Sequence, residues 1–200
     1  MTARPGTVID LLRHGEVEGG LCLGAHADAT QSAVGARQVA SWLRAPWRWA
    51  GIVSSPLGRC RAAARTLGAS LGLTPRIEPR FREIGFGEWE GRPWTELLRD
   101  HGDALFAFWA WPGGNPAPGG EDYAAFEERV WAAFGDLIGE ARGQHWLVVS
   151  HDGPIRAILR EILDLPLDRL FHIHVPYGSL ARVQANETGA PVLLWQRTPP

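Results

Sequence analysis

Two histidines and two arginines occupy positions from which one polar site could be built, although they lie far apart in the sequence. Arg13, His14 and His151 each follow a short apolar run, and Arg59 lies in the first turn of a predicted helix. Ligands of open parallel α/β sheets bind beyond the carboxyl ends of the strands. Because these apolar runs are predicted to be such strands, we expect all four side chains to meet at one edge of the sheet.

These residue types favour the binding of a tetrahedral dianion such as a phosphate group. Arginine offers paired donors to phosphate oxygens, and helix N-termini add backbone N–H groups. Neighbouring arginines also lower the pKa of a histidine, because like charges repel, so that the imidazole keeps a lone pair near neutral pH. Such a histidine can attack phosphorus. The chemistry then needs an acid for the leaving group, which we expect to be a carboxyl in a loop covering the phosphate.

The composition excludes several other classes of protein. All 20 basic residues are arginine, so enzymes that need a catalytic or phosphate-binding lysine are excluded. The 200 residues carry a formal net charge of −2, which does not favour a nucleic-acid partner, and a hydrophobic content of 45% argues against disorder. No apolar stretch approaches the ~18 residues that span a membrane, and the two cysteines, Cys22 and Cys60, fit a reducing compartment. We therefore expect a cytoplasmic protein without a membrane partner.

The apolar pattern predicts the elements that position these residues. A short buried strand followed by a loop and a helix occurs three times, which is typical of a sheet with parallel strands. The predicted strand–helix pairs are 8–12 with 32–43, 52–55 with 57–71, and 147–150 with 154–163. We expect a three-layer α/β/α sandwich around a mostly parallel central sheet, with residues 1–200 forming one domain.

The middle and the end of the chain have a different pattern. Residues 85–120 hold four of the ten tryptophans and a Gly/Pro run at 112–120, a composition that predicts a small insertion without regular elements, packed over the active site. Residues 122–141 carry apolar side chains at helical spacing. Three further strands are predicted at 171–175, 179–184 and 192–196, the last two joined by a turn at 186–189.

Four short motifs, in this order along the chain, resemble those of the histidine phosphatase superfamily, which includes the cofactor-dependent phosphoglycerate mutases. They are Arg-His-Gly-Glu at 13–16, Ser-Ser-Pro-Leu-Gly-Arg-Cys at 54–60, Phe-Arg-Glu-Ile-Gly-Phe-Gly-Glu-Trp-Glu-Gly at 81–91 and Val-Val-Ser-His-Asp-Gly at 148–153. The resemblance implies a phosphoric monoester hydrolase that uses no metal and no cofactor and acts on a small soluble phosphomonoester.

The resemblance also implies roles for five residues. His14 would be the nucleophile that forms a phosphohistidine, and Arg13, Arg59 and His151 would bind the transferred phosphoryl group. Glu83 would protonate the leaving alkoxide and then act as the base for the attacking water. All five positions hold residue types that can perform these roles.

Less specific similarities indicate a branch of the superfamily. Phe-Gly-Glu-Trp-Glu-Gly-Arg at 86–92 and Gly-Gly-Glu at 119–121 resemble small bacterial phosphatases such as the α-ribazole phosphatases of cobalamin synthesis. α-Ribazole 5′-phosphate is therefore the leading candidate substrate. Residues 18–32 depart from the family's pattern, which leaves the substrate contacts of this loop open. A broad-specificity phosphatase and a phosphoglycerate mutase-type transferase remain the alternatives.

Other interpretations of the same sequence predict different functions. A catalytically silent module could use the site only to bind a phosphorylated ligand. His172 and His174 form a His-x-His pair on one predicted strand face, which would suit a metal-dependent hydrolase. The tryptophans of the insertion could gate a substrate with an aromatic base, pack a homodimer, or pack the insertion onto the sheet.

Overall fold

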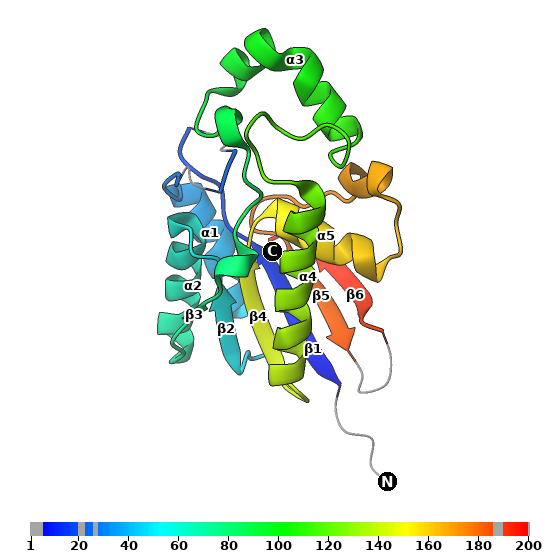
Figure 1. Cartoon of the computed structure of the whole chain (residues 1–200). Coiled ribbons are helices and arrows are strands. Elements are labelled where there is room, and N and C mark those ends of the chain that lie inside the picture. The colour runs from blue at the N-terminus through cyan, green and yellow to red at the C-terminus, as the bar shows by residue number, and fades with distance from the viewer. Residues whose placement is uncertain (1–5, 20–22, 26–27, 186–189, 200) are drawn as a thin grey trace.

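The computed structural model describes residues 6–19, 23–25, 28–185 and 190–199, and a six-stranded sheet forms its centre (Figure 1). The strand order is β3–β2–β4–β1–β5–β6. The first four of these run parallel to one another, whereas β5 and β6 each run antiparallel to the preceding strand in this order. The strands span Thr7–Arg13 (β1), Gly51–Ser54 (β2), Arg76–Ile77 (β3), His145–Ser150 (β4), Leu180–Ala185 (β5) and Val192–Arg197 (β6).

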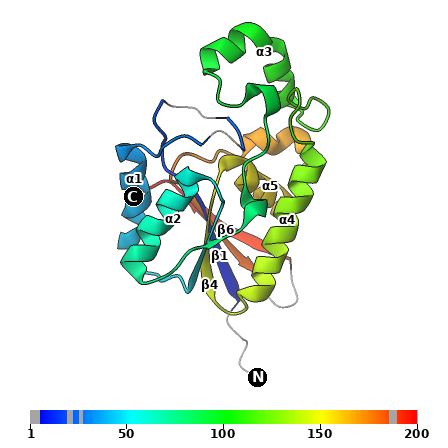
Figure 2. The same cartoon turned by 60° about the vertical axis from the view of Figure 1, so that its left-hand side comes forward.

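Helices cover both faces of this sheet, so the expected three-layer α/β/α architecture is confirmed, with a mixed sheet at its centre (Figure 1, Figure 2). The helices span Ala33–Ala40 (α1), Gly58–Leu71 (α2), Trp94–Ala110 (α3), Tyr123–Glu140 (α4) and Asp152–Ile162 (α5). Short 3₁₀ helices occupy Ser41–Arg44 (η1), Pro79–Phe81 (η2), Gly87–Trp89 (η3) and Leu167–His172 (η4). Among the described residues, no helix is both long enough and apolar enough to cross a membrane.

The central strands are buried on both sides, as their nearly unbroken apolar sequences predict. Leu11, Leu12, Val148 and Val149 are fully buried between the helical layers, where one apolar cluster packs under α1 and α2 and another under α4 and α5. The predicted end of α2 is also confirmed. The residue that follows this helix is Gly72, whose φ of 69° lies in the left-handed region that favours glycine.

The strand predicted at 171–175 is wrong, because this stretch belongs to η4 and to the segment that follows it. Its carbonyl groups bind side chains instead of a neighbouring strand. Arg156 donates to Ile173 O, and Arg13 donates to Val175 O. The strands predicted at 179–184 and 192–196 are confirmed as β5 and β6, and the turn predicted at 186–189 lies outside the described residues.

The insertion at 85–120 contains a long helix, contrary to the expectation of an irregular segment. The dense Gly/Pro run is limited to 112–120, whereas the 17 residues of α3 hold one glycine and no proline and include the helix formers Leu97, Ala104 and Leu105. His101 departs from helical geometry, with φ −136° and ψ 20°, so α3 kinks there. The helix lies beyond the carboxyl ends of the parallel strands, at the top of Figure 1.

A buried ion-pair cluster is built around Asp10 in the middle of β1. Arg182 donates to its two carboxylate oxygens at 2.8 and 2.9 Å, and the ring nitrogens Trp49 Nε1 and His145 Nε2 each lie 2.8 Å from Oδ2. The Arg182 guanidinium also lies 4.1 Å over the Trp47 ring. Burial alone would raise the pKa of Asp10, but Arg182 and His145 hold this pKa below its ordinary value.

We expect Asp10→Asn to lower the free energy of unfolding by about 3–5 kcal/mol, because it leaves the largely buried Arg182 charge without a counter-charge. Urea denaturation near neutral pH, followed by tryptophan fluorescence, measures this change. The control is Asp168→Asn, which removes a carboxylate from an exposed pair with Arg169 and is expected to leave the midpoint almost unchanged. A loss below about 1 kcal/mol for Asp10→Asn would show that the cluster does not stabilise the fold.

Candidate active site

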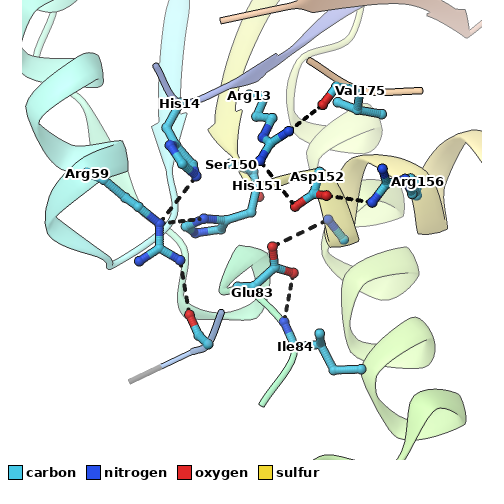
Figure 3. Close-up of polar contacts among 12 residues, drawn as sticks. Arg13, His14, Arg59, Glu83, Ile84, Ser150, His151, Asp152, Arg156 and Val175 are labelled. Atoms are coloured by element: carbon cyan, nitrogen blue, oxygen red, sulfur yellow. Dashed lines mark hydrogen bonds and ion pairs between the residues drawn. The ribbon is translucent and has the colours of Figure 1, made fainter. Parts of the chain in front are cut away.

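The five residues to which the sequence analysis assigns roles lie together at the carboxyl ends of the parallel strands (Figure 3). Arg13 ends β1 and His14 follows it, Arg59 lies in the first turn of α2, and His151 directly precedes α5. Glu83 follows η2. All are buried except Arg13, whose side chain is 12% exposed. The sheet edge therefore carries a compact polar site assembled from four separate parts of the chain.

The register of the sheet places the two histidines side by side. Arg13 of β1 pairs with Ser150 of β4, so the residues that follow them, His14 and His151, leave the sheet at the same level. The N–H of His14 donates to Ser150 O at 2.9 Å. Gly15 allows the close approach of α1 here, because a Cβ at this position would lie 2.1 Å from a main-chain carbonyl oxygen of that helix.

The hydrogen bonds of His14 leave its Nε2 atom with a lone pair. Nδ1 lies 2.8 Å from Gly15 O, so Nδ1 carries the proton and donates it to this carbonyl. Arg59 Nε lies 3.3 Å from His14 Nε2 and 3.2 Å from His151 Nδ1, and its N–H donates toward both. Two unprotonated imidazole nitrogens therefore face one guanidinium group.

His151 is held by Ser55, a residue to which the sequence analysis assigns no role. Ser55 Oγ lies 2.7 Å from His151 Nε2. Because Nδ1 of this ring accepts from Arg59, Nε2 carries the proton and donates to Ser55. The signal that could have identified Ser55 is its position directly after β2, where a parallel strand delivers residues to the site.

Arg13 is fixed in place by contacts on several sides of its guanidinium. Nη1 donates to Val175 O at 2.6 Å, and Cζ lies 3.9 Å from the centroid of the Tyr177 ring. Nη2 lies 3.8 Å from Oδ1 of Asp152. Because the side chain is already ordered, it loses little conformational entropy when it binds an anion.

Burial and positive neighbours keep both imidazoles uncharged. For His14, burial together with the charges of Arg59 and Arg13 lowers the pKa to about 3. Burial and the charge of Arg59 also lower the pKa of His151 well below its ordinary value. Both rings are therefore neutral near neutral pH, and His14 Nε2 can act as a nucleophile.

Glu83 faces the histidines across the site, with its carboxyl at the start of α5 (Figure 3). The N–H of Ile84 donates to Oε1 at 2.9 Å, and the N–H of Gly153 lies 3.4 Å from Oε2. Burial raises the pKa of Glu83 to about 8, and the negative charge of Asp152 acts in the same direction. Glu83 is therefore mostly protonated near neutral pH and can donate a proton.

The segment that carries Glu83 is held by an arginine that the sequence analysis does not single out. Arg129 of α4 donates to the carbonyl oxygens of Arg80, Arg82 and Glu83 at 2.7, 2.9 and 3.1 Å. Its guanidinium also forms a bidentate pair with Glu121, at 2.6 and 2.7 Å. One arginine in an amphipathic helix looks like ordinary surface charge in the sequence, so only the tertiary structure identifies this contact.

A cavity of about 260 Å³ opens between the polar residues and the insertion. Its lining includes Arg13, His14, Arg59 and Glu83 together with a largely aromatic wall of Phe86, Trp94, Phe108, Trp109, Tyr123 and Phe171. The Trp109 ring centroid lies 5.4 Å from those of Trp94 and Phe108. The other two tryptophans of the insertion do not line the cavity, since Trp89 is buried in the core and Trp111 is 54% exposed.

The His-x-His pair is not arranged as a metal site would require. His172 ends η4 and His174 lies in the segment after it, so the two exposed side chains do not share a strand face as predicted. Within the part of the chain that the structure describes, no group of three or more His, Cys, Asp or Glu side chains could hold a metal ion.

Comparison with known proteins identifies the family. Residues 9–198 match the histidine phosphatase superfamily (branch 1). The chain is 29% identical over 182 residues to the adenosylcobalamin/alpha-ribazole phosphatase of Salmonella typhimurium. This match covers 88% of this chain and 90% of the relative. It is 31% identical over 185 residues to a bifunctional protein of Mycobacterium tuberculosis, over 90% of this chain and 50% of that one. Another curated relative is matched over 64% of its length.

Solved structures share the fold. The alpha-ribazole phosphatase from Shigella flexneri has a TM-score of 0.79 and 26% sequence identity, covering 96% of this chain and 95% of that one. Bacillus stearothermophilus YhfR has a TM-score of 0.86 at 22% identity, covering 94% and 95%. The chain therefore belongs to the histidine phosphatase superfamily, as its four motifs indicate, and with it to a family of phosphoric monoester hydrolases.

We expect His14 Nε2 to stay unprotonated from about pH 8 down to about pH 5, because burial and the arginine charges oppose the imidazolium form. Long-range ¹H–¹⁵N NMR spectra of the histidine-labelled protein measure this, with the His14 signals assigned by comparison with His14→Asn. A titration midpoint for His14 between about pH 6 and pH 7 would contradict the neutral-imidazole interpretation.

Proposed function

We propose that the protein hydrolyses phosphomonoesters and that the phosphoryl group passes through His14. The observation that carries this proposal is an uncharged His14 Nε2 at the cavity, with Arg13 and Arg59 beside it and the acid Glu83 facing it. A tetrahedral dianion in this cavity would meet cations, a nucleophile and a proton donor together. Phosphoryl transfer requires little more than such positioning and charge stabilisation.

In the first step, His14 Nε2 donates its lone pair to phosphorus while the bond from phosphorus to the ester oxygen breaks. Glu83 gives its proton to that oxygen, so the product leaves as a neutral alcohol. Arg13 and Arg59, with His151 beside them, bind the remaining phosphoryl oxygens and stabilise the charge of the transition state.

In the second step, a water molecule attacks the phosphohistidine. The water oxygen bonds to phosphorus as the nitrogen–phosphorus bond breaks, and Glu83, now a carboxylate, takes a proton from the water. Inorganic phosphate leaves, and Glu83 is protonated again. Side chains of the protein balance the charge in both steps, so this mechanism requires no metal.

The cavity walls favour a substrate whose alcohol carries an aromatic group. Trp94, Trp109 and Phe171 can contact such a ring, and aromatic pairs contribute about 0.5–1.5 kcal/mol beyond the burial of their area. α-Ribazole 5′-phosphate, which has an aromatic base, fits this chemistry and is the leading candidate. The names of two relatives, one matched by sequence and one by structure, support the same choice. This substrate would place the enzyme in cobalamin biosynthesis in the cytoplasm.

A phosphoglycerate mutase-type transferase is supported less well. Phosphoglycerates carry a carboxylate besides the phosphate, so their binding calls for a further cation. Among the described residues, Arg156 is the one additional arginine that lines the cavity, and it already donates to Asp152 and to Ile173 O. An aromatic wall offers no partner to a second anion.

We expect the wild-type protein to hydrolyse p-nitrophenyl phosphate with EDTA present throughout, and His14→Ala to lose at least about a thousandfold in kcat/KM, because the nucleophile is removed. The control is His172→Ala, which removes an exposed histidine that does not line the cavity and is expected to leave activity unchanged. Activity that survives in His14→Ala would contradict the mechanism, and loss of activity with EDTA would favour a metal-dependent hydrolase.

Phosphoenzyme trapping distinguishes this enzyme from a silent module that only binds a phosphorylated ligand. The wild-type protein is mixed with a radiolabelled substrate and the reaction is quenched rapidly without acid. We expect radiolabelled phosphate to stay bound to the protein and to be released when acid is added. The same treatment of His14→Ala is expected to yield none. A binding module would yield none in either protein.

We expect Trp109→Ala to lower kcat/KM for α-ribazole 5′-phosphate about tenfold or more, because the substrate ring loses apolar contact. Turnover of glycerol phosphate, which has no ring, is expected to change less than about threefold. The matched control is Trp111→Ala, which removes a tryptophan of the same insertion outside the cavity. Equal losses for the two substrates would argue against a wall that binds the ring.

A further inference from the structure

The side chain of Asp152 lies between the acid of the site and two arginines, and the mechanism above gives it no role. Asp152 is the first residue of α5, and it lines the cavity. Its Oδ2 accepts from Arg156 Nη1 at 2.5 Å, and its Oδ1 lies 3.8 Å from Arg13 Nη2 (Figure 3). Two positive charges therefore stabilise Asp152 as a carboxylate.

The Glu83 carboxyl packs against the same turn of α5. The N–H of Gly153 lies 3.4 Å from Glu83 Oε2, and a Cβ on Gly153 would lie 2.1 Å from Oε1, so the glutamate fills the space that a side chain would take. In this position the Glu83 carboxyl lies close to that of Asp152, at the same turn of α5 and on the wall of the same cavity (Figure 3). Two buried carboxyls this close do not readily ionise together, because their like charges repel, so one of them keeps a proton.

The two arginines decide which carboxyl holds that proton. Arg13 and Arg156 pair with Asp152, whereas Glu83 accepts hydrogen bonds from main-chain N–H groups. Burial would raise the pKa of Asp152, but the charges of Arg13 and Arg156 hold this pKa below its ordinary value. The proton therefore resides on Glu83, which agrees with the raised pKa of that group.

We propose that Asp152 is a positioning residue, which keeps the proton on Glu83 while Arg13 and Arg156 hold Asp152 ionised. Because Glu83 is the acid of the reaction proposed above, this assignment rests on the proposed function. Once Glu83 has given its proton to the leaving oxygen, two carboxylates face each other. Their repulsion makes Glu83 a stronger base toward the attacking water.

Other charged or titratable groups around Glu83 do not replace Asp152 in this role. The groups that line the same cavity or lie directly behind it are Arg13, His14, Arg59, Tyr123, His151 and Arg156. The charge of Arg59 lowers the pKa of Glu83, opposite to the effect of Asp152. Arg129 binds the main-chain carbonyl of Glu83 rather than its carboxyl. After burial, the charge of Asp152 is the strongest influence that favours the protonated acid.

The test is the pH dependence of kcat/KM for an alkyl phosphate, whose leaving alkoxide needs a proton. Wild-type activity is expected to fall as the pH rises through about 8, where Glu83 ionises. In Asp152→Asn, which keeps the shape and removes the charge, this midpoint is expected to fall by about one pH unit or more, with kcat/KM near pH 5.5 within about threefold of wild type. Glu88→Gln, the matched control, removes an exposed charge on the same segment and is expected to leave the midpoint unchanged.

A second variant tests the same assignment in the opposite direction. Arg156→Gln removes a cation from beside the carboxyls of Glu83 and Asp152, so these two groups keep their last shared proton to higher pH. The pH at the midpoint of the fall in kcat/KM is therefore expected to rise. A purely structural role would not shift the profile in opposite directions in the two variants. An unmoved midpoint in Asp152→Asn, or a loss of activity by the same factor at every pH, would overturn the proposal.

Quench experiments separate a failure of this proposal from a failure of the proposed function. If wild type and Asp152→Asn both form phosphohistidine while the midpoint does not move, the assignment of Asp152 is wrong and the proposed function holds. If the wild type forms no phosphohistidine, the proposed function fails and the role of Asp152 fails with it. In Glu83→Gln the fall of activity at high pH is expected to disappear, and its persistence would also overturn the assignment.

Discussion

The Arg59 Nε–H group lies between two imidazole nitrogens, and the chemistry of the site depends on this contact. His14 Nε2 and His151 Nδ1 can accept from Arg59 only while neither nitrogen carries a proton. A protonated ring would bring a second positive charge to within hydrogen-bonding distance of a guanidinium in a buried site, where charge repulsion is strong. Both rings therefore remain neutral, and His14 keeps the lone pair that phosphoryl transfer to nitrogen needs.

Several distant parts of the chain hold this contact in place. The parallel pairing of β1 with β4 brings His14 and His151 to the same level of the sheet. Asp28 accepts from the N–H groups of Gly58 and Arg59, which caps the start of α2 and holds its first turn. The aromatic wall comes from other parts of the chain, mainly the insertion with its helix α3, together with Tyr123 of α4 and Phe171 of η4. The fold thus separates the residues for the common phosphate chemistry from those that contact the rest of the substrate.

Local sequence patterns predicted most of the secondary structure, and they were wrong where a partner decides the conformation. The central strands and the end of α2 at Gly72 follow from apolar burial and from the preference of glycine for positive φ. Residues 171–175 look like a strand, but Arg13 and Arg156 take carbonyl groups in this stretch. The helix α3 was missed because the neighbouring Gly/Pro run at 112–120 dominated the composition of the insertion.

The sequence by itself determined the family, the chemistry class and the five residues that meet at the sheet edge, because residue type and order in the four motifs carry this information. Only the tertiary structure decided which contacts hold these residues in place and which groups shift their pKa values. Ser55, Arg129 and Asp152 act through contacts with residues that are distant in the sequence, such as Arg13 in the case of Asp152. Such contacts depend on how strands and helices pack, and so do the burial and charge proximity that shift the pKa values of His14 and Glu83. No local pattern in the sequence records them.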